Sequence, residues 1–253
     1  MILDLFRLDG KTALVTGSSR GLGLAMATAL AEAGARVALH GSQSVSDEAL
    51  QCVAEAREGC VAVTGDVSDP EACKAIVERV IEQFGRIDIL VNNAGTIRRA
   101  RAEDYSWDDW HAVLETNLSS VFRMTQLAGR QMLAQGAGKI INIASLLTFQ
   151  GGILVPSYAA AKGGVGQLTK AFANEWAARG INVNAVAPGY METDNTSALR
   201  ADPVRSRQIM ERIPAGRWGK PSDLAGAAVF LASSACDYLH GHTLVVDGGW
   251  MSR

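Results

Sequence analysis

Seven short apolar runs, separated by longer helical stretches, constrain the fold of this chain more than any other feature. Several runs are continuously apolar instead of alternating, which is typical of strands buried on both faces, as in parallel sheets. Such alternation predicts βαβ units in one α/β domain, a doubly wound parallel sheet with helices on both faces. The expected strands are Thr12–Thr16, Arg36–His40, Val61–Thr64, Ile87–Asn92, Lys139–Ala144, Ile181–Val186 and Thr243–Val246.

The stretches between these runs carry helix start and stop signals. Gly21–Gly34 is rich in Ala and Leu and ends on a glycine, and Asp69-Pro70 opens another helix with proline in its first turn. Further helices are expected over Trp107–Gln135, Ser157–Arg179 and Pro221–Ser233. No linker rich in Pro, Gly or Ser divides the chain, so residues 1–253 are expected to form a single domain.

The polar segment Met191–Arg217 interrupts this rhythm directly after the turn Pro188-Gly189. Ligands of open α/β sheets bind at the carboxyl ends of the strands, where this segment begins. The position favours a substrate lid around residues 191–217, and the alternative is a surface excursion without function.

Charge and composition exclude several function classes. Lys plus Arg number 24 and Asp plus Glu 26, so the net charge of −2 argues against a nucleic-acid partner. No run of 18 apolar residues is present, and the first residues lack the pattern of a signal peptide. We therefore expect a cytoplasmic protein without membrane association.

Metal chemistry is not indicated. The four cysteines form no CxxC pair, and no histidine stands near them at zinc-site spacing. The close pair His240 and His242 lacks a neighbouring carboxylate cluster, so we expect loop residues and no metal.

A glycine-rich loop, Thr16–Gly23, joins the first expected strand to the first expected helix. Glycine allows the tight turn and the close approach of a pyrophosphate, and the helix N-terminus offers free N–H groups and a positive dipole. The spacing is G-x-x-x-G-x-G, not the commoner G-x-G-x-x-G. In this strand-to-helix context it predicts dinucleotide binding.

Further motifs follow in order along the chain. They are Asn92-Asn93-Ala94-Gly95, Asn117, Ser145, the Tyr-x-x-x-Lys motif of Tyr158 and Lys162, and Pro188-Gly189. Together with the glycine-rich loop, they identify the chain as resembling the classical short-chain dehydrogenase/reductase family, whose fold is a Rossmann-type sheet. The resemblance implies an NAD(P)-dependent oxidoreductase that acts on CH–OH groups.

Tyr158 and Lys162 are one helical turn apart, so they share a face of their helix. A cation at that distance is expected to lower the tyrosine pKa from its usual value of about 10 and to suit Tyr158 for general acid–base catalysis. Ser145 is expected to hold the carbonyl oxygen. The resemblance implies that Lys162 also binds the nicotinamide ribose and that Asn117 anchors a proton-relaying water.

The resemblance also implies a set of cofactor contacts. Asp66 is expected to accept from the adenine amine, Asn93 to brace the sheet, and Thr193 to bind the nicotinamide carboxamide. The complete expected set is Gly17, Ser19, Arg20, Gly21, Leu22, Gly23, Ser42, Asp66, Val67, Asn93, Ala94, Gly95, Tyr158, Lys162, Pro188, Gly189 and Thr193.

The segment after the second strand bears on the choice of nicotinamide cofactor. NAD enzymes usually place an acid there to hold the ribose hydroxyls. Here no carboxylate appears before Asp47, and Arg20 can reach a 2′-phosphate. The sequence therefore favours NADP, with NAD as the alternative because Gln43 stands where a second basic residue is expected.

Adjacent arginines, Arg98 and Arg99, follow Asn92–Gly95 and suit a substrate carboxylate, because guanidinium offers a bidentate fork. Segments 145–157, 188–200 and 212–220 resemble the sugar-acid dehydrogenases of the family, which act on gluconate and its deoxy-keto derivatives. The expected substrate is thus a small sugar acid. Its expected contacts are Arg98, Arg99, Gln150, Arg205 and Arg217.

Other functions stay open at this point. A 3-oxoacyl carrier-protein reductase is compatible with arginines near the cleft, and a dinucleotide-sensing binding protein is the non-enzyme alternative. The C-terminal strand Thr243–Val246 and the segment after it resemble those of family homotetramers, so a homotetramer is expected.

Overall fold

Seven parallel strands form one sheet in the computed structural model, which describes residues 1–253. The strand order is β3-β2-β1-β4-β5-β6-β7, and every neighbouring pair is parallel. This arrangement confirms the predicted doubly wound α/β fold. The strands are β1 (Thr12–Val15), β2 (Arg36–Gly41), β3 (Val61–Thr64), β4 (Ile89–Asn92), β5 (Gly138–Ile143), β6 (Ile181–Pro188) and β7 (Thr243–Val246).

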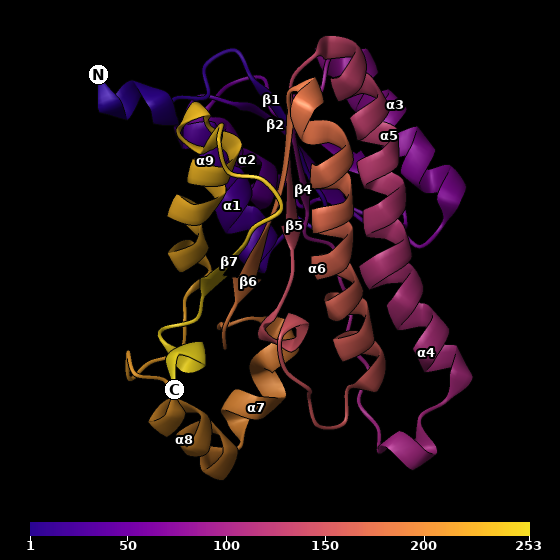
Figure 1. The fold of residues 1–253 in the computed structure, drawn as a ribbon, viewed down its shortest axis with the longest axis vertical. Helices are drawn as coiled ribbons and strands as arrows, with labels where there is room; N and C mark the ends of the chain where they lie inside the picture. The colour runs from indigo at the N-terminus through magenta and orange to yellow at the C-terminus, as the bar shows by residue number, and fades with distance from the viewer.

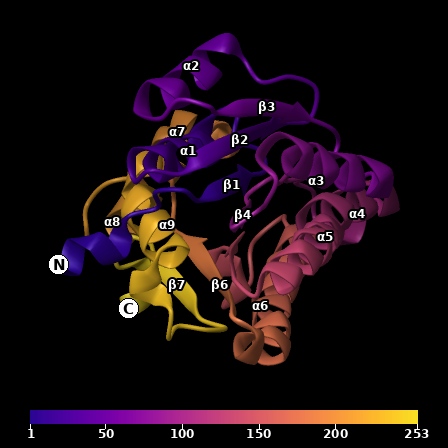
Figure 2. The same cartoon turned by 90° about the horizontal axis from the view of Figure 1, so that it is seen from above.

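Helices cover both faces of the sheet, as Figures 1 and 2 show. One face carries α1 (Gly21–Glu32), α2 (Asp47–Ala56) and α9 (Ala225–Ala232). The other carries α3 (Pro70–Phe84), α4 (Trp107–Leu114), α5 (Ser120–Gln135) and α6 (Pro156–Trp176). Two short helices, α7 (Ser197–Ala201) and α8 (Pro203–Arg212), lie at the carboxyl edge of the sheet.

The central strands are buried on both faces, which explains their continuous apolar sequence. In β1, Ala13 and Val15 belong to the core under α1, whereas Leu14 belongs to the core under α3 and α5. Fully burying a leucine contributes about 1.5–3 kcal/mol relative to leaving it exposed. A polar residue in either position would therefore face a helix layer instead of water.

The helix ends follow the predicted signals closely. Asp69 caps α3 by accepting from Glu71 N–H at 2.9 Å, and Pro70 occupies the first turn. The expected helix over 107–135 is interrupted by a π-helical turn, Glu115–Ser119. The helix α2, capped by Ser46, has no counterpart among the predicted elements, although Ala49 and Val53 form its buried face.

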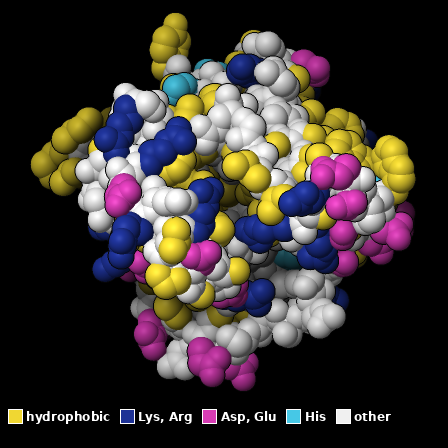
Figure 3. All heavy atoms as spheres, turned by 90° about the horizontal axis from the view of Figure 1, so that it is seen from below, with side chains coloured by type: hydrophobic (Ala, Val, Ile, Leu, Met, Phe, Trp, Pro, Cys, Tyr) yellow, Lys and Arg dark blue, Asp and Glu magenta, His cyan; other side chains and the backbone are white.

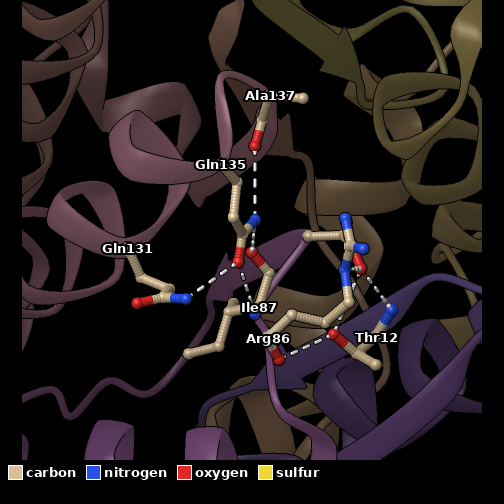
Figure 4. A network of polar contacts seen from close by, with 7 residues as sticks. Thr12, Arg86, Ile87, Gln131, Gln135 and Ala137 are labelled. Carbon is tan, nitrogen blue, oxygen red and sulfur yellow. Dashed lines mark hydrogen bonds and ion pairs between the residues drawn. The ribbon is translucent and has the colours of Figure 1, made fainter.

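The amino edge of the sheet is tied by a hydrogen-bond network, drawn in Figure 4. Gln135, at the end of α5, donates to Ile87 O at 2.9 Å and accepts from Ile87 N–H at 3.3 Å. Thr12 Oγ1 donates to Arg86 O at 2.9 Å. These contacts join α5, β1 and the segment before β4, and they leave the opposite edge for the loops that build the site. No helix of the structure has the length and apolarity that crossing a bilayer requires.

Candidate active site

A cleft of about 820 Å³ opens at the carboxyl edge of the sheet, where the strand order reverses between β1 and β4. Ligands of doubly wound sheets bind at such switch points. Figure 3 looks onto this edge, where Lys and Arg side chains surround a central hollow. The lining of the cleft includes most of the expected cofactor residues, namely Gly17, Ser19, Arg20, Gly21, Leu22, Gly23, Ser42, Asp66, Val67, Asn93, Ala94, Gly95, Tyr158, Lys162 and Thr193.

The glycine-rich loop forms the wall beneath α1. Gly17 has a φ of +61°, and a Cβ there would lie 2.9 Å from Ala94 Cα, so only glycine fits without strain. Arg20 is the N-cap of α1, and no side chain caps this helix. The first N–H groups of α1 and its dipole are thus available to an anion, which fits a dinucleotide pyrophosphate.

Asn93 joins the glycine-rich loop to the end of β4. Its side-chain amide donates to Thr16 O and to Gly17 O, each at 2.9 Å. Its backbone N–H donates to Thr16 Oγ1 at 3.0 Å. These bonds give the expected bracing role of Asn93 a structural basis, and they show that Asn93 holds the glycine-rich loop as well as the sheet.

Where the cleft meets the end of β2, that strand provides no carboxylate. His40, Gly41 and Ser42 line it there, and Asp66 follows β3. Asp66 Oδ1 accepts from the N–H and the hydroxyl of Ser68, each at 2.9 Å, so it orders this turn without capping α3.

Arg20 extends over the cleft and pairs with Asp194 of the segment 191–217, Nε to Oδ2 at 2.8 Å. About four fifths of each side chain is exposed. An exposed pair of this kind contributes little to stability, so the Arg20 side chain can exchange Asp194 for another anion at small cost.

Pro188 and Gly189, at the end of β6, do not line the cleft themselves. Gly189 N–H donates to Val246 O at 2.9 Å, and a Cβ at Gly189 would lie 2.6 Å from Asp247 Cα. The glycine thus lets the chain leave β6 beside β7. Thr193, four residues on, reaches the cleft lining.

Tyr158 and Lys162 lie one turn apart on α6 and both face the cleft. The Lys162 Nζ is 5.6 Å from the Tyr158 ring centre and donates to Ile143 O at 2.5 Å. Ser145, two residues after β5, lies close enough to Tyr158 for its hydroxyl to lower the pKa of the tyrosine. The three side chains expected to carry the chemistry are therefore brought together from β5 and α6.

The electrostatics of this group differ from the sequence-based prediction. Burial raises the pKa of Tyr158, although the neighbouring Ser145 hydroxyl and the charge of Arg99 lower it in part. Burial also lowers the pKa of Lys162 to about 8. The prediction that the tyrosine pKa lies below its ordinary value is wrong for this structure, because removing the phenolate from water outweighs the neighbouring groups.

Asn117 lies in the π-helical turn between α4 and α5 and is fully buried. Its amide donates to Val113 O at 2.8 Å and to Thr96 O at 2.9 Å, and its oxygen accepts from Thr96 N–H at 3.1 Å. Single π-helical turns inside α-helices occur frequently at functional sites. Here the turn places Asn117 against the segment after β4, beside the cleft.

The two adjacent arginines diverge. Arg98 lines the cleft and pairs with Asp109 at 3.4 Å, whereas Arg99 donates to Asn195 O at 3.0 Å. Arg99 also lies close enough to Tyr158 for its charge to act on the hydroxyl. A cation therefore stands beside the group expected to exchange the proton.

Of the five expected substrate residues, only Arg98 belongs to the lining of this cleft. Arg217 forms an ion pair with Asp223 at 2.6 Å, and Arg205 donates to Gln208 within α8 at 3.3 Å. Gln150 is half-buried in the loop before α6. The structure thus places Arg98 in the cleft and Arg99 at its rim, against Asn195, and it brings none of these three side chains there.

Sequence reasoning did not single out three further lining residues, His40, His111 and Glu115. Glu115 pairs with Arg123 at 2.8 Å, and His111 stacks beside Trp107 with ring centres 5.8 Å apart. His40 is buried at the end of β2. The one sequence signal that points to His40 is its position two residues before Ser42, an expected cofactor contact. No three His, Cys, Asp or Glu side chains form a metal-binding group.

Comparisons with known proteins agree with this architecture. The family model described as "Enoyl-(Acyl carrier protein) reductase" matches residues 17–251. The 2-dehydro-3-deoxy-D-gluconate 5-dehydrogenase of Bacillus subtilis (strain 168) is 56% identical, and the alignment covers 99% of this chain and 98% of the relative.

Two crystal structures are similar over the full length. One is described as a 2-deoxy-D-gluconate 3-dehydrogenase from Agrobacterium tumefaciens with bound NADP; it is 54% identical, with a TM-score of 0.92, over 98% of this chain and 99% of that one. The other is a gluconate 5-dehydrogenase from Burkholderia cenocepacia J2315 in complex with NADP and tartrate; it is 43% identical, with a TM-score of 0.94, over 100% of both chains. With the motifs and the sheet order, these likenesses show that the chain belongs to the short-chain dehydrogenase/reductase family.

Proposed function

We propose that this chain is an NADP(H)-dependent oxidoreductase that interconverts a hydroxyl and a keto group of a sugar acid, as a 2-dehydro-3-deoxy-D-gluconate 5-dehydrogenase does. The observation that carries the proposal is the position of Arg99, which donates to O of the lining residue Asn195 at 3.0 Å and whose charge reaches Tyr158. A substrate with a carboxylate can bind this cation while presenting its carbonyl to the tyrosine. The full-length relatives named above support the same substrate class.

The residues of the cleft fit a dinucleotide. The uncapped N-terminus of α1 and the bare backbone at Gly17 suit the pyrophosphate, and Asp66 suits the adenine amine. When bound, the nicotinamide group supplies or accepts the hydride. Arg20 is the cation proposed for a 2′-phosphate, since β2 ends without a carboxylate that would repel it.

The chain's own side chains then handle the proton. In the reducing direction, Tyr158 donates its proton to the carbonyl oxygen while the Ser145 hydroxyl holds that oxygen. The raised pKa of Tyr158 keeps the phenol protonated near neutrality, as an acid in this direction must be. Lys162 favours the phenolate left behind, and Asn117 is proposed to anchor the water that returns the proton.

Segment 191–217 is proposed as a lid. Its residues Thr193, Asp194 and Asn195 line the cleft, and Asp194 and Asn195 contact Arg20 and Arg99 across the opening. On its other side, Ile209 and Ile213 pack in an apolar cluster with Leu146, Trp218 and Trp250. The lid is thus anchored by apolar contacts and closed by polar ones.

We also propose a cytoplasmic homotetramer. The α5 side chain of Phe122 is 41% exposed and stacks on Phe172 of α6, which leaves an apolar surface on these helices. The edge strand β7 exposes Val245. The free thiols agree with a reducing compartment. Light scattering of a dilute sample is expected to give four chains; a stable monomer would contradict the assembly, and cell fractionation tests the compartment.

The decisive experiment is a substrate panel followed at the nicotinamide absorbance band. It compares 2-dehydro-3-deoxy-D-gluconate, 5-keto-D-gluconate, a neutral keto sugar and a 3-oxoacyl thioester, each with NADPH and NADH. We expect turnover of the two sugar acids with NADPH. Preferred turnover of the thioester would instead assign a 3-oxoacyl carrier-protein reductase, and binding of NADPH without any turnover would assign a dinucleotide sensor.

A further inference from the structure

His40 stands between the glycine-rich loop and the end of β3. Its side chain is buried, with 1% of the residue exposed. The imidazole Nδ1 is 3.0 Å from Gly17 N, and Nε2 is 2.9 Å from Gly65 O. One ring therefore links the first glycine of the loop to the segment that leads to Asp66.

These two partners dictate the protonation state of the ring. A backbone N–H can only donate, so Nδ1 must accept from Gly17. A backbone carbonyl can only accept, so Nε2 must carry the proton that is donated to Gly65. Both bonds exist only in the neutral imidazole. A second proton on Nδ1 would face the N–H of Gly17 and break that contact.

The backbone of His40 holds the same loop. Ser18 N–H donates to His40 O, and His40 N–H donates to Ser18 Oγ, each at 2.8 Å. Gly17 itself has a φ of +61° and contacts Ala94 closely. The orientation of the Gly17 peptide thus depends on His40, and it determines how the chain enters the N-terminus of α1, which receives the pyrophosphate in the proposed function.

We propose that His40 is a positioning residue for the cofactor: its neutral imidazole holds the glycine-rich loop in the conformation that binds NADP(H), and protonation of the ring weakens that binding. This inference rests on the cofactor of the proposed function and is independent of the substrate.

The surroundings of His40 determine the direction of its pH response. Burial lowers the pKa of His40, and this outweighs the backbone hydrogen bond to Gly65 and the charge of Asp66, both of which raise it. Arg20 lines the same cleft from the loop side. Because the pKa lies below its ordinary value of 6.5, the ring is neutral near neutral pH, and the contact with Gly17 is lost only when the pH falls through this lowered pKa.

The test measures NADP⁺ dissociation constants by protein fluorescence in the full chain, from about pH 8 down to the lowest pH at which circular dichroism shows the native fold, because the pKa of His40 lies below the ordinary histidine value. His40→Asn places an amide oxygen near the position of Nδ1 and cannot titrate. We expect it to bind nearly as tightly as wild type at about pH 8. At the acid end, the wild type should bind at least about fivefold more weakly than this variant. Protonation of the NADP⁺ phosphate affects the dissociation constants of both proteins equally, so it cancels in the ratio of wild type to variant.

Two further variants complete the design. His40→Leu leaves the Gly17 N–H without an acceptor, and we expect NADP⁺ binding to weaken about 5- to 100-fold with a smaller change in kcat at saturating cofactor. His242→Asn, on an exposed histidine outside the cleft, should keep the wild-type pH profile. The proposal is overturned if His40→Asn follows the wild-type profile, if wild-type binding is flat with pH, or if His40→Leu in its folded form binds like wild type. Loss of sugar-acid turnover with intact pH-dependent binding would count against the proposed substrate alone.

Discussion

Arg99→Ala should separate substrate recognition from the rest of the site. The Arg99 side chain is exposed, donates to Asn195 O at 3.0 Å and lowers the pKa of Tyr158 by its charge. Removing one partner of a desolvated charge pair costs about 2–5 kcal/mol. Because Arg99 lies at an exposed rim that the substrate and lid must cover, we take the low end. About 2 kcal/mol corresponds to a rise in KM of about 30-fold for the sugar acid.

The same variant has a second signature. Without the Arg99 cation, the pKa of Tyr158 should rise further, so the pH at which alcohol oxidation begins should move upward. Steady-state kinetics with a sugar acid and with a neutral keto sugar measure both effects. Arg101→Ala, on a nearby arginine paired with Glu103, is the matched control and should resemble wild type. Equal losses for charged and neutral substrates would refute carboxylate recognition by Arg99.

Three other predictions concern the cofactor and the proton. Tyr158→Phe should lower turnover by at least about 10²-fold while NADPH binding persists in fluorescence titration, and near-normal turnover would remove the tyrosine from the chemistry. Arg20→Ala should weaken NADPH binding more than NADH binding; equal losses would show that Arg20 does not contact the 2′-phosphate. Lys162 has an ordinary pKa of 10.5 in the unfolded chain and about 8 in the folded one, so it makes stability rise with pH across that window. Denaturant unfolding of Lys162→Met should show a smaller rise, and an unchanged slope would contradict the burial of a neutralised lysine.

The strands could be predicted because their signal is local. A strand buried on both faces must be apolar at successive positions, and this pattern places the fully buried strands β1 and β4 within two residues of their observed bounds. The edge strands β3 and β7 are partly exposed, and their short apolar runs also match the observed bounds. Where tertiary pairing extends a strand, the prediction is less accurate: β6 continues to Pro188 because its last residues pair with Thr243–Val246. The helix α2 was missed although its sequence carries a start signal: Ser46 caps it, and Asp47 and Glu48 stand in its first turn.

The site divides in a similar way. Its residue types follow from motifs with a chemical reason, such as glycine at Gly17, where φ is positive and Ala94 is close. Partners that are distant in the sequence do not follow. Arg217 forms an ion pair with Asp223, and Arg20 forms one with Asp194. Neither pairing can be predicted from the spacing of these residues along the chain.

The sequence by itself determined the alternation of strands and helices, the glycine-rich loop and the residues available for proton transfer, because each depends on neighbours a few positions away. Only the tertiary structure decided how those residues behave. The pKa of Tyr158 is raised, not lowered, because burial of the side chain outweighs the charge of Arg99. His40 must be neutral because Gly17 and Gly65, 23 and 25 residues away, meet on opposite sides of its ring. Solvation and hydrogen-bond direction depend on which groups surround an atom in space, and this is settled only when the sheet has assembled.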